Sequence, residues 1–205
     1  MTVGSRLTVD DVAEFSEELR FELLDGKVFR RPSPLPFHQI QCVDVVDALR
    51  RNAPEEYPAA YGMAVELDRY NMPFIDAVVI RARSALRAPV PVGDVLLAVE
   101  VTSSWSEAID RGPKKWLYAR AGIPAYWLVD SVAERISITQ FVLGADRRYR
   151  RRLHSAERVT LDAPWPTVID LPAMTREREA LRAAAWPSRG GVPITMERDE
   201  RDNMA

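Results

Sequence analysis

The 205-residue sequence contains little cysteine, histidine or lysine. With Cys42 as the sole cysteine, neither an intramolecular disulfide nor a zinc site built from several thiolates can form. Such sparse cysteine suits a reducing compartment, and we expect a cytoplasmic protein. No apolar run approaches the ~20 residues that a membrane-spanning helix needs, and the N-terminus lacks the apolar stretch of a secretory signal. The composition therefore predicts a globular protein without a membrane partner.

The charge balance limits the nucleic-acid-binding modes that are open to the chain. The formal net charge is −2 and the pI is near 5.8, which argues against a large basic surface that coats nucleic acid. A nuclease is not excluded, because carboxylates that hold a divalent cation lower the pI while they create a locally positive site.

Only three of the 28 basic residues are lysine, and two of these, Lys114 and Lys115, are adjacent. A compact ammonium can reach a water or a phosphate as a point charge. The alternative is that these two lysines have no specific role and lie by chance on a solvated helix face.

Turn signals and hydrophobic periodicity predict one α/β (α+β) domain over residues 1–172, and a C-terminal helix with a disordered tail over 173–205. Asp25-Gly26 between two apolar runs predicts an N-terminal hairpin, and Thr8-Val9-Asp10-Asp11 resembles a capping box. Gly122 and Pro124 predict a helix end. Predicted helices cover 8–18, 38–52, 106–121 and 175–186. Predicted strands cover 20–24, 27–31, 61–68, 74–80, 95–102, 125–130, 135–143, 147–154 and part of 159–171. Loops are predicted at 31–37 and 81–94.

Two of the predicted strands each carry one carboxylate within an otherwise apolar run, namely Asp76 and Glu100. Strands that are apolar on both faces belong in the middle of a covered sheet. An unpaired buried carboxylate costs several kcal/mol, roughly, so each acid requires a partner. Two carboxylates that project together from neighbouring strands form a hard-oxygen site suited to Mg²⁺ or Mn²⁺. The alternative is an ion pair with one of the many arginines.

The helix that follows Glu100 carries Asp110, Lys114 and Tyr118 at positions i, i+4 and i+8. At about 100° per residue these side chains share one helix face. We expect the first turns of this helix to lie beside the end of the Glu100 strand, where Lys114 can reach a metal-bound water. The alternative is an ordinary Asp–Lys surface pair. On the N-terminal hairpin, Glu22 is a further candidate carboxylate.

Taken in order, these segments resemble the Uma2 family, which belongs to the PD-(D/E)XK, restriction-endonuclease-like superfamily. The strings that carry the resemblance are 21–26 (FELLDG), His38 after a proline-rich loop, Asp76, 99–103 (VEVTS), 110–114 (DRGPK), Tyr118 and 121–130 (AGIPAYWLVD). The resemblance implies a mixed central sheet flanked by helices, a Mg²⁺-dependent phosphodiesterase site that acts on nucleic acid, DNA above all, and a homodimer.

The same resemblance implies roles for individual residues. Asp76 and Glu100 match the motif acids and would bind the metal together with the Val101 carbonyl. Glu22 matches a hairpin glutamate that would either add a ligand or support the ligands from behind. Lys114 matches a helix lysine that replaces the usual lysine two residues after the glutamate, where this chain has Thr102. Ile75 stands where the family usually has a proline, so the backbone geometry next to Asp76 is expected to depart from the family pattern.

The roles of the remaining candidate residues stay open at this stage. His38 would contact the phosphate or serve as a core residue at the start of a helix, and Asp110 and Tyr118 would orient Lys114. Arginines of the 81–87 and 147–152 segments are candidate phosphate contacts, with surface solvation as the alternative. Because they lie in predicted regular elements, Trp116, Tyr126, Trp127 and Trp165 are expected in the core, with base stacking as the alternative.

Two other functions compete with a metal-dependent nuclease. One is a binding module that recognises nucleic acid or protein without turnover, and the other is a structural protein whose Asp76 and Glu100 pair with arginines. The sequence lacks GxGxxG, GxxxxGK[ST], HExxH and GxSxG motifs and has only two histidines, which disfavours other enzyme classes.

Overall fold

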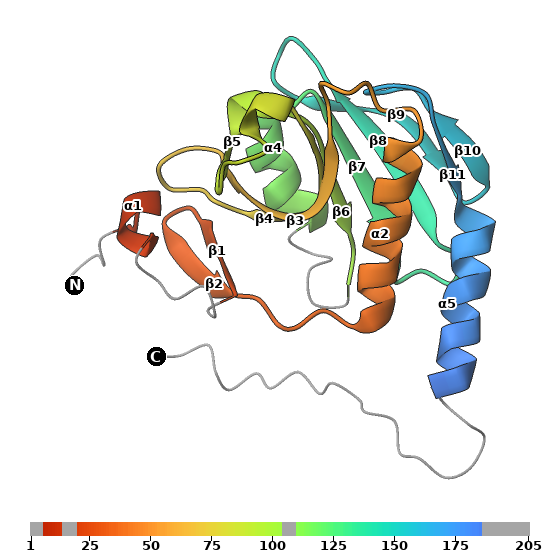
Figure 1. Cartoon of the computed structure of the whole chain (residues 1–205). Coiled ribbons are helices and arrows are strands. Elements are labelled where there is room, and N and C mark those ends of the chain that lie inside the picture. Colours follow the sequence, from red (N-terminus) through yellow and green to blue (C-terminus); the bar gives the residue numbers. More distant parts are fainter. Residues whose placement is uncertain (1–5, 14–19, 104–109, 186–205) are drawn as a thin grey trace.

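The computed structural model describes residues 6–13, 20–103 and 110–185. Its main feature is a mixed seven-stranded sheet of order β5-β3-β4-β6-β7-β8-β9 (Figure 1). Four pairs of neighbouring strands are antiparallel, namely β3–β4, β4–β6, β7–β8 and β8–β9, whereas β6 pairs parallel with β7 and β3 pairs parallel with β5. The strands are β3 (Ala59–Glu66), β4 (Phe74–Ile80), β5 (Val90–Pro91), β6 (Val95–Val101), β7 (Ala125–Asp130), β8 (Ser137–Leu143) and β9 (Tyr149–Ser155).

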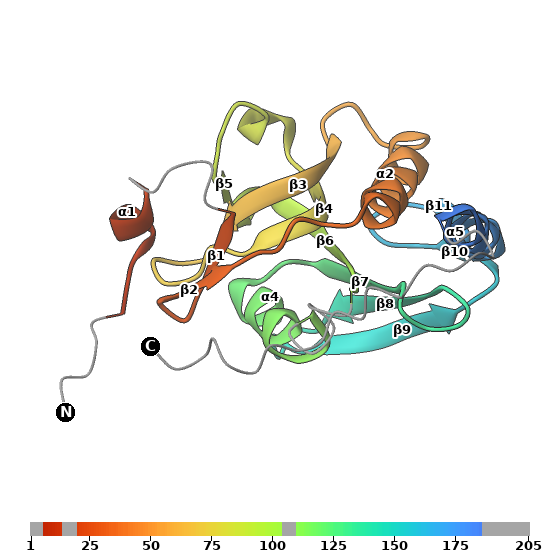
Figure 2. The same cartoon turned by 90° about the horizontal axis from the view of Figure 1, so that it is seen from below.

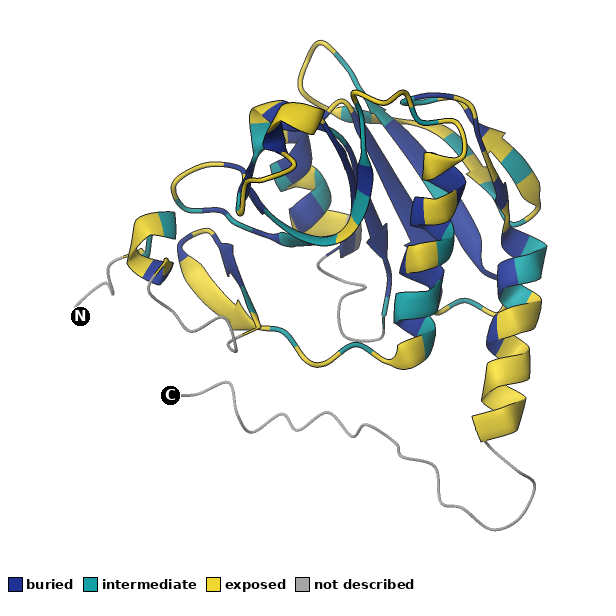
Figure 3. Ribbon diagram, in the orientation of Figure 1, coloured by how far each residue is buried: buried dark blue, intermediate teal, exposed yellow. Residues whose placement is uncertain are grey.

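Helices cover both faces of this sheet, because alternate residues of the central strands are apolar on each side. On one face α2 (Pro36–Arg50) and α5 (Leu171–Ala185) pack over a core that includes Val99 and Trp127. On the other face α4 (Lys115–Ala121) packs over a core that includes Ala98 and Tyr126. Figures 2 and 3 show these layers and the buried central strands. The predicted central position of the two apolar strands is confirmed, since β4 and β6 are direct neighbours.

Two small hairpins complete the fold. The N-terminal hairpin joins β1 (Phe21–Leu24) to β2 (Lys27–Arg30) through Asp25 and Gly26, both at positive φ, as two-residue hairpin turns of this sequence require. It contacts the segment before β4 through a bridge between Leu23 and Met72. The second hairpin joins β10 (Arg158–Leu161) to β11 (Thr167–Asp170). The first hairpin places a glutamate-bearing strand next to the beginning of β4.

The element predictions hold with a few corrections at the ends of helices. The capping box at Thr8 is present, and helix α1 (Val9–Val12) is described only up to Ala13. Helix α2 begins at Pro36, two residues earlier than predicted, because proline is tolerated in the first turn. Helix α5 likewise begins at Leu171. The predicted loop 81–94 contains the short strand β5 and two 3₁₀ turns, η1 (Ala82–Ser84) and η2 (Val92–Asp94). The predicted tail 187–205 and residues 106–109 of the predicted helix lie outside the described residues.

The prediction that Trp116 lies in the core is wrong. Its side chain is 57% exposed, whereas Trp127, Tyr126 and Trp165 are buried as expected. A residue two positions from a buried one on a helix points roughly to the opposite side. Because Lys114 and Tyr118 face the sheet, Trp116 faces outward. None of the described helices has the length and apolar character to span a membrane.

Candidate active site

The two predicted carboxylates meet at one end of the central sheet. β4 and β6 pair antiparallel up to Ala77 and Val99, and Asp76 and Glu100 come next along the two strands. Both therefore project from the same face, and the backbone N–H of Val101 donates to Asp76 Oδ2 at 2.9 Å. Asp76 is 8% exposed and Glu100 is 1% exposed. Two acids that are buried side by side need a strong local source of positive charge.

Lys114 supplies part of that charge from a π-helical turn, η3 (Asp110–Lys114), that leads into α4. Its Nζ lies 2.8 Å from Glu22 Oε1 and 3.2 Å from Glu100 Oε1. The turn contains Pro113, which cannot donate a helical hydrogen bond and so favours a local departure from α-helix geometry. The single wide turn thus delivers a lysine from the sequence after β6 to the carboxylates of β1 and β6.

The predicted shared face of Asp110, Lys114 and Tyr118 is confirmed. Asp110 Oδ1 lies 3.4 Å from Lys114 Nζ, and the hydroxyl of Tyr118 donates a short hydrogen bond to Glu100 Oε1. All three side chains are buried. They are therefore part of the buried ionic cluster and not a solvent-exposed surface pair.

Glu22 reaches the same cluster from the N-terminal hairpin. Its Oε1 accepts from the backbone N–H of Phe74 at 3.1 Å in addition to its ion pair with Lys114. Its Oε2 is buried and, within the described part of the chain, has no hydrogen-bond partner. Because a buried carboxylate oxygen without a hydrogen-bond partner is unfavourable, a cation or a donor that enters the site would stabilise it.

His38 approaches the cluster from the start of α2. Its Nε2 lies 2.9 Å from the Val101 carbonyl oxygen and 3.5 Å from Asp76 Oδ2. On the other side of the ring, Nδ1 lies 3.6 Å from Cys42 Sγ. His38 Nε2 thus lies near both Asp76 and the Val101 carbonyl, and ligand atoms of His38, Cys42 and Asp76 all lie within 4.8 Å of one another.

The electrostatics of the cluster follow from burial and from the close packing of acids. Burial, reinforced by the charges of Asp110 and Asp76, holds the pKa of Glu100 well above its usual range, although Lys114 opposes this. Burial works against the charge of Lys114, but the surrounding carboxylates outweigh it and raise the pKa of the ammonium. For Asp76 the hydrogen bond and charge of His38 outweigh burial, so its pKa is lowered. The pKa of His38 is raised in return, because Asp76 outweighs the effect of burial.

Arg31 is a site residue that the sequence did not reveal. Its guanidinium lies 3.7 Å from Glu22 Oε1 and 3.8 Å from Asp76 Oδ1, distances too long for hydrogen bonds. The guanidinium stacks over the Phe74 ring, with its Cζ 4.0 Å from the ring centroid. Nothing in the residue pattern marks Arg31 among 25 arginines, since its position depends on how the hairpin packs against β4. Arg31 therefore lies beside Glu22 and Asp76 but forms no hydrogen bond with either carboxylate.

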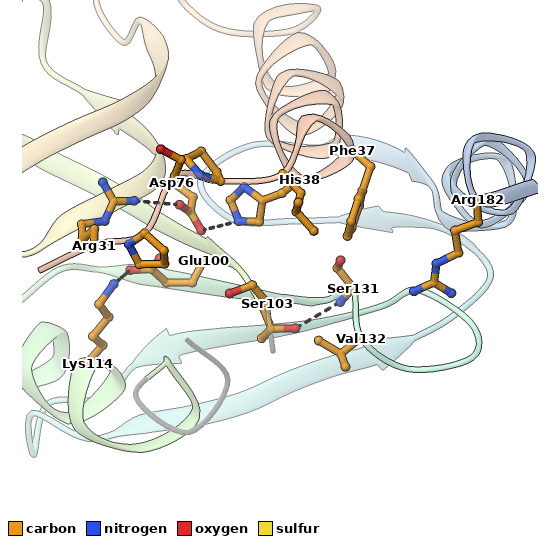
Figure 4. A pocket seen from close by; sticks show the side chains of 15 residues that line it. Arg31, Phe37, His38, Asp76, Glu100, Ser103, Lys114, Ser131, Val132 and Arg182 are labelled. Carbon is orange, nitrogen blue, oxygen red and sulfur yellow. Dashed lines mark hydrogen bonds and ion pairs between the residues drawn. The ribbon is translucent and has the colours of Figure 1, made fainter. Parts of the chain in front are cut away.

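The cluster opens into a cavity of about 310 Å³. Asp76, Glu100 and Lys114 line one end of it (Figure 4). The residues at the other end, also missed from the sequence, come from the proline-rich loop, from α2, from the loop after β7 and from α5; they include Leu35, Phe37, Ser131, Val132 and Arg182.

The candidate arginines of the two surface segments have other partners. In the 81–87 segment, Arg83 is bound to Asp94. On β9, Arg150 pairs with Asp146 and Arg152 pairs with Asp162. None of these arginines lines the cavity at Asp76, so the surface interpretation fits them better than a role at the scissile phosphate.

Comparisons with known proteins agree with this geometry. The sequence profile of the Uma2 family, described as "Putative restriction endonuclease", matches residues 8–172. Among solved structures, the chain is similar to "a putative nuclease belonging to DUF820" from Anabaena variabilis, with 15% identity, a TM-score of 0.60, and coverage of 83% of this chain and 92% of that one. At this identity the likeness shows a shared fold. A comparison with curated proteins finds no match. The family profile spans most of the chain, and the protein belongs to the Uma2 family.

Proposed function

We propose that the protein is a divalent-metal-dependent endonuclease that hydrolyses phosphodiester bonds of nucleic acid, with Mg²⁺ or Mn²⁺ as cofactor. The observation that carries this proposal is the convergence of Asp76, Glu100 and Lys114 at one end of a single cavity. The membership in a family described as nucleases supports the same conclusion. The cluster combines acids that can hold a cation with an ammonium that can face a phosphate.

The residues present fit a hard divalent ion. Asp76 and Glu100 line the cavity, and the Val101 carbonyl and Glu22 lie next to them, beside His38 and Lys114 respectively. Oxygen donors therefore dominate, as Mg²⁺ and Mn²⁺ require. Four carboxyl groups, those of Glu22, Asp76, Glu100 and Asp110, face two fixed cations among the described residues, Lys114 and Arg31. Cys42 Sγ lies within 4.8 Å of ligand atoms of His38 and Asp76, but Cys42 is not a ligand in this proposal, because burial raises the pKa of its thiol and Mg²⁺ and Mn²⁺ favour oxygen donors.

When bound, the ion would polarise a phosphate oxygen and lower the pKa of a coordinated water. The side chains around the site supply charge stabilisation and positioning. Lys114, held by Glu22 and Glu100, places a fixed positive charge where negative charge develops on the phosphate. Tyr118 and Asp110 hold the lysine and Glu100 in position. His38 holds the Val101 carbonyl and Asp76 on the opposite side.

The test compares cleavage of single-stranded and duplex DNA and of RNA by the full chain in EDTA, Mg²⁺ and Mn²⁺. Asp76→Asn and Lys114→Met are expected to lower the rate about 100-fold or more. Asp47→Asn, on the exposed side of α2, is the matched control and should cleave like wild type. Equal cleavage by all four proteins would identify a contaminating enzyme and reject the proposed site.

One observation favours a second candidate function, a binding module without turnover. Lys114 already forms ion pairs with the carboxylates, and Arg31 lies near two of them, so the acids have cationic partners without a metal. Metal-independent binding of nucleic acid by wild type, with no cleavage in any divalent ion, would establish this function.

DNA as the natural substrate, a homodimeric state and a cytoplasmic location belong to the same proposal and rest on the family resemblance and the sparse cysteine. Sedimentation equilibrium of the full chain measures the oligomeric state directly.

A further inference from the structure

The cavity at the carboxylates continues well past the residues that the proposed chemistry uses. Seen from Asp76, Phe37 and Ser131 lie beyond His38, and Arg182 lies farther along the same direction (Figure 4). The far end is lined by Leu35, Phe37 and Val132, whose side chains are half-buried or exposed. A metal and a phosphate need no such apolar wall.

The chemistry of this wall changes in a definite order along the cavity. Carboxylates and an ammonium stand at one end, an aromatic ring with aliphatic neighbours follows, and the half-exposed guanidinium of Arg182 lies at the other end. A nucleotide offers groups that fit this order, with one phosphate at the metal site, the flat face of the base that branches from the sugar against the aromatic ring, and the next phosphate near the guanidinium. The volume of about 310 Å³ is at the lower limit of small-ligand sites, which begin near ~300 Å³.

We propose that this apolar end binds one unpaired nucleobase next to the phosphate held at Asp76 and Glu100, with the base stacked on Phe37 and the next phosphate near Arg182. The proposal rests on the proposed nuclease function and narrows its substrate to nucleic acid with at least one unpaired nucleotide at the cut. In an intact duplex both faces of a base are covered by its neighbours, so an aromatic ring inside a cavity reaches a base only after the base leaves the stack.

The charge distribution supports an unpaired strand over an intact duplex. A protein that binds the phosphate backbone of a duplex usually presents a broad basic surface, whereas this chain has a net charge of −2. The described cations that line the cavity are Arg31, Lys114 and Arg182. Lys114 is held by buried carboxylates, Arg31 lies 3.7 Å from Glu22, and the half-exposed Arg182 pairs with Glu179 at 3.2 Å. Stacking on an aromatic ring supplies affinity that does not depend on such a surface.

The test measures binding by fluorescence anisotropy with the full chain carrying Asp76→Asn, so that the oligonucleotide stays intact. The probes are a 12-nucleotide single strand, the same strand in a duplex, and single strands with one abasic nucleotide at each position in turn. We expect tighter binding of the single strand than of the duplex. One abasic position is expected to weaken binding about five- to hundredfold, which is the range of base–aromatic stacking.

Substitutions at Phe37 then assign that abasic effect to the cavity. Adding Phe37→Ala should remove the abasic penalty, Phe37→Tyr should keep it, and Phe37→Leu, which is apolar without a ring face, should lose most of it. Val43→Ala is the matched control, because Val43 is exposed on the same helix and does not line the cavity. Arg182→Gln should reduce the slope of log affinity against log salt by about 0.7, the value for one phosphate contact on a single strand.

Three results would overturn the proposal. These are equal affinity for duplex and single strand, an abasic penalty that persists in Phe37→Ala, and a Phe37→Ala variant that alters only self-association in sedimentation and leaves oligonucleotide binding unchanged. Failure of the nuclease function is distinguishable from these, because it appears as absent cleavage by wild type while base-dependent binding remains.

Discussion

Replacing Lys114 by methionine is expected to lower the free energy of unfolding by about 3–5 kcal/mol at pH 8, which is the cost of removing one partner from a buried ion pair. The magnitude follows from the surroundings of its Nζ, which lies 2.8 Å from Glu22 and 3.2 Å from Glu100 in a site that is almost closed to solvent. Without the ammonium, Glu100 stays buried without its cationic partner, and Glu22 keeps only the guanidinium of Arg31 at 3.7 Å.

The neighbouring Lys115 provides the control. Its Nζ lies 3.8 Å from the centre of the Phe141 ring and its side chain is half-buried, so Lys115→Met should cost no more than ~1 kcal/mol. The two variants lose the same charge from adjacent positions. Any difference between them therefore reports the buried cluster and not the net charge of the protein.

The destabilisation should depend on pH with a definite sign. Burial and the neighbouring acids already raise the pKa of Glu100 in the folded protein, with Lys114 opposing them. Removal of the lysine raises that pKa further, so the folded variant takes up a proton that the unfolded chain releases. The stability difference between wild type and Lys114→Met should therefore grow as pH rises from about 5 to 8.

The assay is urea unfolding followed by tryptophan fluorescence, to which the buried Trp127 and Trp165 contribute, at pH 5 and at pH 8, with and without Mn²⁺. Saturating Mn²⁺ at about 100 times its dissociation constant would add about 2.7 kcal/mol to any form that binds it. Equal unfolding free energies for Lys114→Met and Lys115→Met at pH 8 would refute the account of the cluster.

Further predictions concern stability and the parts of the fold that support the site. Hydrogen bonds from Arg83 and Ser84 lower the pKa of Asp94 to about 2, so Asp94→Asn should be less stable than wild type above pH 4. The two should converge as acid unfolding is followed toward pH 2, because this contribution is lost as pH falls through the folded pKa. The buried guanidinium of Arg178 donates to the carbonyls of Ser131, Ala133 and Glu134. Arg178→Met should therefore cost about 3 kcal/mol or more in urea unfolding, and lysine should not restore it. Gly122 ends α4 at φ +91°, a conformation that strains any residue with a Cβ, so Gly122→Ala should lose about 1–2 kcal/mol while the cleavage rate of the folded fraction stays unchanged.

The elements that the sequence predicts well are those in which local chemistry and tertiary packing agree. The Asp25-Gly26 turn, the apolar strands around Asp76 and Glu100, and the helix end at Gly122 all lie where the pattern places them. Lys114 and Tyr118 share a face because the spacing of four residues survives the change from π-helical to α-helical geometry.

The features that the sequence could not supply depend on contacts between distant segments. Arg31 reaches Asp76 and Glu22 only because the N-terminal hairpin folds against the start of β4. Phe37 and Arg182 meet at one cavity because two helices from opposite ends of the chain cover the same sheet face. Periodicity marked Trp116 as apolar and helical, but it did not indicate which side of the helix faces the sheet.

The central claim is that Asp76 and Glu100 hold a divalent cation. The most direct test is anomalous diffraction from crystals of the full chain soaked in Mn²⁺. A bound cation at this site should give an anomalous peak about 2.2 Å from carboxylate oxygens of Asp76 and Glu100 and from the Val101 carbonyl. Density that shows Mn²⁺ bound elsewhere, while Lys114 and Arg31 remain the partners of these acids, would contradict it.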